Sequence, residues 1–229
     1  MKNVSISSST FIFLKNLKKN NNREWFNKHK ETYLKEHQQI IAFADSLLEA
    51  MKKHDHIETK SGKESLFRIY KDTRFSKDKT PYKSHWSGDF KRATKKLRGG
   101  YYFHIEPGNS FVAGGFFGPN PEDLRRIRQD IALNYKEWRK MLSNKSFVKT
   151  FGKLLGELVK TAPKGFSSDH PAIDLLRYKQ FLLKHSFTDK EVLSPTFLTE
   201  AVKTFKNMRT FFDYMSEVLT TNANGESII

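Results

Sequence analysis

The chain has 229 residues, of which 37% are hydrophobic and 20 are phenylalanine, so it can bury a sizeable core in one large domain or two small ones. It contains no cysteine, which excludes disulfides, thiol nucleophiles and thiolate metal sites. Its 41 basic and 25 acidic residues give a net charge of +16, which attracts nucleic acids, anionic membrane surfaces or phosphorylated small molecules. Most of the basic residues are lysines, and a solvated lysine-rich surface is the simplest alternative.

Uninterrupted apolar runs are short, as at Phe11 to Leu14, so we expect neither a membrane span nor a secretory segment, and a cytoplasmic protein. Nothing resembling a Gly/Ser-rich or Pro-rich linker divides the sequence. We therefore expect a single domain over residues 1–229.

The first fifty residues have a helical pattern. Ser9 or Thr10 can cap a first helix, and the three asparagines at 20–22 can cap a longer second one. In the second helix the apolar residues recur at spacings near three and four, which predicts one buried stripe and a lysine-rich opposite face.

Four strand-like segments follow, at 65–70, 84–90, 101–106 and 110–117. Pro-Gly-Asn joins the last two, which predicts an antiparallel hairpin.

The remaining pattern is helical. Asn120 and Pro121 predict the start of a helix that ends near Ser143, and a shorter helix is expected over 146–155. A long final helix is expected from Ser194 to about Leu219, with a frayed tail at 221–229. Helices, then strands, then helices indicate an α+β fold, with a mostly antiparallel sheet flanked by helices and long helices at both ends.

The segment from Arg68 to Tyr82 places seven charged residues between apolar anchors. Such a cluster can form an anion-binding site or an internally paired electrostatic clasp. In the first interpretation the anion is held by Arg68, Arg74, Lys79 and Lys83, and Asp72 and Asp78 orient the cations. Tyr82 or His104 would then be the catalytic proton donor. In the second interpretation Asp72 and Asp78 simply neutralise the neighbouring cations.

These residues resemble the signature of the bacterial family catalogued as domain of unknown function 2461, Arg-x-x-Arg-Asp-x-Arg-Phe followed by Asp-Lys and a tyrosine. Lys71 departs from it, because it stands where the family usually has arginine, and a lysine cannot make a two-pronged hydrogen bond. Further similarity lies at 21–26, 100–105 and 170–177, so the resemblance covers almost the whole chain. It implies no activity and no cofactor.

Other chemistry has weaker support in the sequence. His104 and Glu106 share a strand face, and His85 and Asp89 lie on a neighbouring strand, so a histidine–carboxylate metal site can be drawn. No recognised metal-ligand spacing accompanies these residues, and no metal site is predicted. The glycine-rich stretch before Pro121 lacks the phosphate-loop spacing, and no motif identifies a cofactor.

Two other functions stay open. A nucleic-acid-binding module would use the basic loop at 91–98, with the basic group at 125–128 and Tyr101 and Tyr102 as stacking surfaces. A protein-interaction scaffold would use the charge clasp structurally and expose an apolar patch to its partner. The sequence predicts an anionic small molecule as the first partner, whether the protein is only a binder or an enzyme acting on a phosphorylated or carboxylated substrate. It indicates no oligomeric state.

Overall fold

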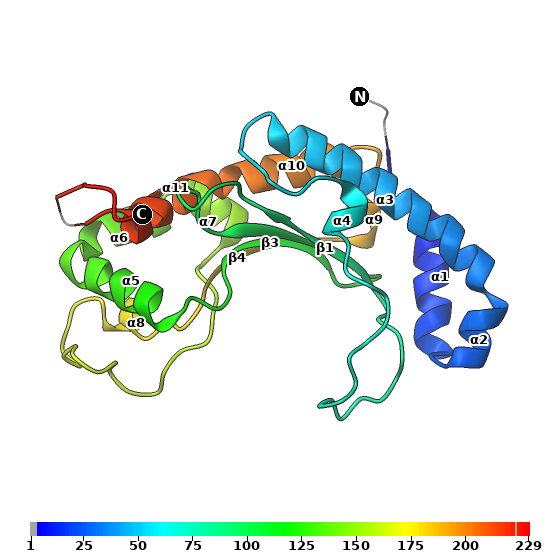
Figure 1. Cartoon of the computed structure of the whole chain (residues 1–229), viewed down its shortest axis with the longest axis horizontal. Coiled ribbons are helices and arrows are strands. Elements are labelled where there is room, and N and C mark those ends of the chain that lie inside the picture. Colours follow the sequence, from blue (N-terminus) through cyan, green and yellow to red (C-terminus); the bar gives the residue numbers. More distant parts are fainter. Residues whose placement is uncertain (1–3, 223) are drawn as a thin grey trace. The chain divides into compact units, whose positions relative to one another are not determined.

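The computed structural model describes residues 4–222 and 224–229 (Figure 1). The helices of its first half are α1 (Ser8–Lys19), α2 (Arg23–Lys28), α3 (Lys30–Lys52) and α4 (Gly62–Ser65). The strands are β1 (Trp86–Lys91), β2 (Gly100–Ile105), β3 (Ser110–Phe116) and β4 (Phe181–Phe187). The later helices are α5 (Pro121–Leu133), α6 (Tyr135–Leu142), α7 (Lys145–Phe151), α8 (Ile173–Leu176), α9 (Asp189–Val192), α10 (Phe197–Asn207) and α11 (Arg209–Thr220).

The strands form one antiparallel sheet in the order β1-β2-β3-β4. The α+β class and the hairpin of β2 and β3 are therefore confirmed, while β4 was not expected from the sequence. No helix in the described part of the chain is both long and apolar enough to cross a bilayer.

Contacts divide the chain into two compact units. Unit 1 comprises the described residues of Met1–Lys91, Tyr102–Val112 and Ser186–Lys203, and unit 2 comprises those of Arg92–Tyr101, Ala113–His185 and Thr204–Ile229. Both units are built from segments that are distant along the chain, and the single domain expected over residues 1–229 stays a prediction.

The core of unit 1 is aromatic. Phe43 of α3 stacks on Phe197 of α10 at 5.4 Å between ring centroids, and its other neighbour is Phe103 of β2. Gly62 lies against the backbone of α3, where an added Cβ would approach the Asp45 nitrogen to 2.3 Å. Only glycine allows α4 to pack this closely, and the Gly62 amide donates a hydrogen bond to the Asp45 carboxylate.

In the core of unit 2, residues of α11 pack against the rings of Trp138 and Tyr101. Trp138 of α6 meets Phe181 and Phe211, and Tyr101 meets Phe205 and Phe212. Burial of these rings accounts for the apolar stripe of the last helices.

Several expected boundaries differ from the structure. Ser7, and not Ser9 or Thr10, caps α1. Asn22 caps a helix as expected, but this is the short α2, and the longer helix α3 begins separately after His29. The helix expected from 121 to 143 is divided at Asn134, and the long final helix is divided at Met208. Segment 65–70 contains two isolated bridges, at Leu66 and Tyr70, in place of a continuous strand.

The tail is paired in the structure. Thr221 and Ser227 form an antiparallel bridge, and the Asn222 amide donates to the Glu226 carbonyl. The expectation of fraying also covered residue 223, which lies outside the described residues.

Candidate functional site

The charged segment begins in an irregular antiparallel pairing. Leu66 pairs with Gly88, and Tyr70 pairs with Tyr82. Three residues lie between Leu66 and Tyr70, whereas five residues lie between Tyr82 and Gly88 on the opposite segment. The opposite segment, from Lys83 to Ser87, therefore carries two extra residues. A bulge of this kind re-aims side chains, and His85 lies at its centre.

Beyond Tyr70 the segment forms an exposed loop that pairs several of its own charges. The Arg74 guanidinium donates to both oxygens of the Asp72 carboxylate, at 3.0 Å from Nε and 2.6 Å from Nη2. Lys71 Nζ lies 2.5 Å from Asp78, and Lys79 Nζ donates to the Thr73 carbonyl. The hydrogen bond from Arg74 lowers the pKa of Asp72, and that from Lys71 lowers the pKa of Asp78.

Arg68 and Lys83 lie apart from these pairs. Arg68 is exposed, and Lys83 Nζ lies 5.5 Å from the centre of the Phe67 ring. Burial, and then the charge of Arg68, lower the pKa of Lys83. The two cations therefore repel each other, while the charge of Arg68 also contributes to the lowered pKa of Asp72.

An open hollow of about 890 Å³ lies beside the loop, within unit 1. Its charged lining consists of Arg23, Lys71, Lys77, Lys79 and Asp78. In the described part of the chain, the side chains of Arg23 and Lys77 make no hydrogen bond or ion pair. We call this feature the basic hollow. It includes one of the four predicted anion-binding residues, Lys79, while Arg68, Arg74 and Lys83 are outside its lining.

Tyr82 is part of the lining of the basic hollow, although only 3% of its surface is exposed. Its ring stacks on Phe26 at 4.0 Å, and the Asn21 side chain hydrogen-bonds both the nitrogen and the carbonyl of its backbone. Burial, and then the nearby Tyr70, raise the pKa of Tyr82, so its phenol stays protonated at neutral pH.

His104 lies on β2, in a second polar group of unit 1. Its Nε2 is 3.2 Å from Glu106, its Nδ1 is 3.0 Å from the Tyr102 hydroxyl, and its ring centre is 4.1 Å from that of His85. Burial, and then His104, lower the pKa of His85 to about 4, so its imidazole is neutral at pH 7. Burial alone would raise the pKa of Glu106, but hydrogen bonds from Asn109 and His104 outweigh it and leave that pKa below its ordinary value.

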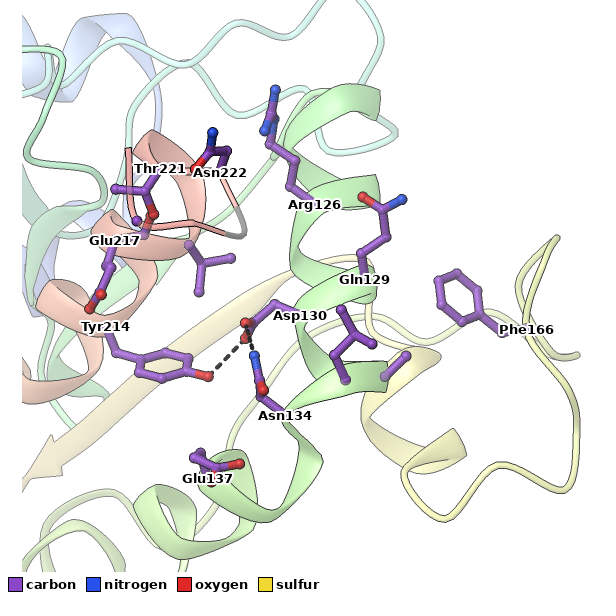
Figure 2. Close-up of a pocket in the computed structure, with 14 residues that line it drawn as sticks. Arg126, Gln129, Asp130, Asn134, Glu137, Phe166, Tyr214, Glu217, Thr221 and Asn222 are labelled. Carbon is purple, nitrogen blue, oxygen red and sulfur yellow. Dashed lines mark hydrogen bonds between the residues drawn. The ribbon is translucent and has the colours of Figure 1, made fainter. Parts of the chain in front are cut away.

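Unit 2 has a hollow of its own, of about 850 Å³, on α5 and α11 (Figure 2). Asp130 is part of its lining and accepts hydrogen bonds from Asn134, Trp138 and Tyr214. Figure 2 shows Tyr214 and Asn134 converging on this carboxylate. Burial, and then the hydrogen bond to Asp130, raise the pKa of Tyr214. Because Asp130 accepts three hydrogen bonds from residues of α6 and α11 and from Asn134, this group is better suited to joining α5, α6 and α11 than to proton transfer.

The basic loop at 91–98 directs its arginines inward. The Arg92 side chain is fully buried and pairs with Asp213, and Arg98 pairs with Asp123. Lys91, Lys95 and Lys96 are exposed. Tyr101 is buried in the unit 2 core, and Tyr102 is engaged with His104.

In the second basic group, Arg128 donates to the carbonyls of Leu176 and Tyr178, whereas Arg125 is exposed. One of the two arginines expected to share an exposed face is therefore occupied within unit 2.

Sequence reasoning missed Arg23 and Lys77 as lining residues of the basic hollow. Lys77 lies inside the charged segment, but its spacing does not distinguish it from Lys79. Arg23 is 45 residues before Arg68, and its helix reaches the hollow through the hydrogen bonds of Asn21 to Tyr82 and the stacking of Phe26 on Tyr82. No local pattern in the sequence reports those contacts.

Comparisons with known proteins give one match. The model of the family described as conserved hypothetical protein (DUF2461) matches residues 9–214. No curated protein and no solved structure matches the chain.

Proposed function

The chain belongs to the family whose model it matches, and we propose that this protein binds a small anion, a phosphorylated or carboxylated molecule, in the basic hollow. The observation that carries the proposal is the excess of positive charge on its lining: four cationic side chains and one carboxylate surround about 890 Å³ of open space.

Two of the four cations have no partner of their own. Arg23 and Lys77 are exposed and make no ion pair among the described residues, so binding a ligand requires no internal bond to break. Lys79 donates only to a carbonyl, from which an anion can draw it away. An arginine next to lysines is suited to a phosphate or carboxylate, because the guanidinium supplies two parallel donors and the ammonium groups supply point charges.

The predicted residues take different roles in this proposal. Lys79 contacts the anion, Asp78 holds Lys71 in the wall, and Tyr82 offers a protonated phenol. Arg68 and Lys83 add long-range attraction, since they lie outside the lining. Arg74 stays with Asp72 in the structural clasp. His104 has no role at the basic hollow.

Isothermal titration with inorganic pyrophosphate tests the proposal. We expect saturable binding to the wild type and a loss of affinity of about tenfold in the double variant Arg23→Ala/Lys77→Ala, which corresponds to about 1.4 kcal/mol. The matched control is Lys35→Ala/Lys52→Ala, which removes the same charge from exposed positions on α3. An equal loss in both double variants would show a response to net charge alone and reject the hollow.

The two other functions make different predictions. A nucleic-acid-binding module would bind an oligonucleotide with a steep salt dependence that depends on Lys95 and Lys96. A scaffold would bind neither pyrophosphate nor oligonucleotide.

A further inference from the structure

Three potential metal ligands converge in unit 1, at a place distinct from the basic hollow. Nitrogen atoms of His85 and His104 and a carboxylate oxygen of Glu106 all lie within 4.8 Å of one another. Among the described residues, they are the one group of three or more His, Asp or Glu side chains with this convergence.

The spacing is close to what a metal ion requires. Imidazole and carboxylate donors lie about 2.0–2.2 Å from a zinc-class ion, which places pairs of donors about 3–3.5 Å apart. His104 Nε2 and Glu106 Oε2 are already 3.2 Å apart. The third donor, from His85, lies within 4.8 Å of both of the others.

The local backbone explains the convergence. His104 and Glu106 are two residues apart at the end of β2, so their side chains leave the same face. The two extra residues between Tyr82 and Gly88 carry His85 to that face, where its ring lies against the ring of His104.

Hydrogen bonds from neighbouring side chains orient His104 and Glu106, while the His85 ring has no such partner among the described residues. Tyr102 hydrogen-bonds the second nitrogen of His104, which fixes the ring orientation, and Asn109 donates to Glu106 at 2.9 Å. In the described part of the chain, neither ring nitrogen of His85 makes a hydrogen bond. His85 is half-buried, and its ring nitrogens are not among the fully buried polar atoms that lack a partner, so they are open to an incoming ion.

A cavity next to Glu106 gives water or a small anion access to the three potential metal ligands. The cavity has a volume of about 310 Å³ and is also lined by Lys15, Lys18 and Ser84. Lys18 Nζ lies 3.7 Å from Glu106, and its side chain is 69% exposed, so it can turn away to solvent when an ion arrives. Water or a small anion in this cavity could fill the remaining coordination positions of the ion.

We propose that His85, His104 and Glu106 bind one divalent first-row transition-metal ion, of the class of Zn²⁺, Co²⁺, Ni²⁺, Mn²⁺ and Fe²⁺. Two imidazoles and one carboxylate, without a thiolate, favour these ions over Mg²⁺ and Ca²⁺, which prefer oxygen ligands alone. The ion would keep open positions toward the cavity beside Glu106, which is the arrangement of a site that exchanges ligands.

Titration of the chelator-treated full chain with Zn²⁺ tests the proposal. We expect one equivalent to bind and the midpoint of thermal unfolding to rise by about 5–10 °C at a hundredfold excess over Kd. His85→Gln and Glu106→Gln should each weaken binding by about tenfold or more, since loss of one of three ligands is at least as costly as loss of a supporting partner. His85→Gln removes no hydrogen bond of the apo protein and should fold.

The control is His56→Gln, which removes an exposed histidine and should leave Zn²⁺ binding unchanged. Equal binding by the wild type, His85→Gln and Glu106→Gln would place the ion elsewhere and overturn the proposal, as would no binding by the wild type.

A second measurement requires no variant. Co²⁺ bound to the wild type should show visible ligand-field bands, and paramagnetic shifts should affect the ring protons of His85 and His104. Shifts confined to other histidines would contradict the assignment.

The charge of Lys18 gives a further check on the site. Lys18→Met should tighten Zn²⁺ binding by about two- to fivefold, because it removes an exposed cation that competes for Glu106. Weaker binding in this variant would contradict the arrangement.

Discussion

The Arg92 side chain is fully buried, whereas Arg23 and Lys77 are exposed on the lining of the basic hollow. Arg92 donates to Asp213, to the Ser216 hydroxyl and to the Arg98 carbonyl, and its guanidinium lies 5.5 Å from the centre of the Phe212 ring. Arg23 and Lys77 make no such contact in the described part of the chain. The net charge of +16 therefore combines cations that hold unit 2 together with cations that are available to a ligand.

The difference between buried Arg92 and the exposed cations of the basic hollow predicts that substitution of Arg92 has the largest effect on the free energy of unfolding. Arg92→Met should lower the free energy of unfolding by about 2–4 kcal/mol, because Asp213, Ser216 and a carbonyl lose a donor inside unit 2. Urea unfolding followed by circular dichroism measures this change. Arg74→Met is the control, since Arg74 is paired only with exposed Asp72, and it should unfold like the wild type. Similar losses in the two variants would remove the distinction between structural and available arginines.

Tyr214 in unit 2 should show the next largest effect. Tyr214→Phe removes the hydrogen bond to Asp130 and should cost about 1–2 kcal/mol at pH 7. Burial, and then the Asp130 hydrogen bond, raise the pKa of Tyr214 above its unfolded value near 10, so this stability is fully present below pH 10.

The stability from Tyr214 is lost as the pH rises through the folded pKa. The difference in unfolding free energy between wild type and Tyr214→Phe should therefore shrink above about pH 10. A difference that grew with rising pH would show that the phenol is not held protonated by Asp130.

Substitution of Asp78 should have a smaller effect, which is an increase in the affinity for pyrophosphate. Asp78→Asn removes the single carboxylate of the basic hollow and releases Lys71, so affinity for pyrophosphate should rise by about two- to fivefold. Asp72→Asn is the matched control, because Asp72 is also paired with a cation but is not part of the lining. A rise in both variants would point to net charge, and a fall in Asp78→Asn would contradict the proposal.

The smallest effect is expected at Arg68. Arg68→Ala should change pyrophosphate affinity by less than about twofold at physiological salt, because Arg68 is exposed and outside the lining of the basic hollow, and salt screens such charges. The same titration measures it. A tenfold loss would favour the anion site predicted from the sequence, built on Arg68, over the basic hollow.

The sequence was sufficient for the elements whose signals are local. Asn22 caps a helix as expected, the hairpin of β2 and β3 follows from Pro-Gly-Asn, and alternation placed His104 and Glu106 on one face. It was insufficient where distant segments decide the result. The strand β4 was missed because its sequence, Phe-Leu-Leu-Lys-His-Ser-Phe, does not alternate regularly between apolar and polar residues. The division of the final helix at Met208 has no proline or glycine that would predict it.

The candidate sites show the same limit. The charged segment from Arg68 to Tyr82 could be found from its composition, but which cations are paired depends on the fold of its loop. The position of His85 depends on two extra residues in an irregular pairing, which no periodicity reports. Arg23 reaches the basic hollow through Asn21, a contact between residues 61 positions apart.

The most direct measurement of the central claim is the position of a bound anion. In a crystal soaked with tungstate, an anomalous scatterer with the charge and shape of phosphate, we expect the strongest peak within contact of Arg23, Lys77 or Lys79. A strongest peak at Arg68 or Arg74, with the basic hollow empty, would contradict it.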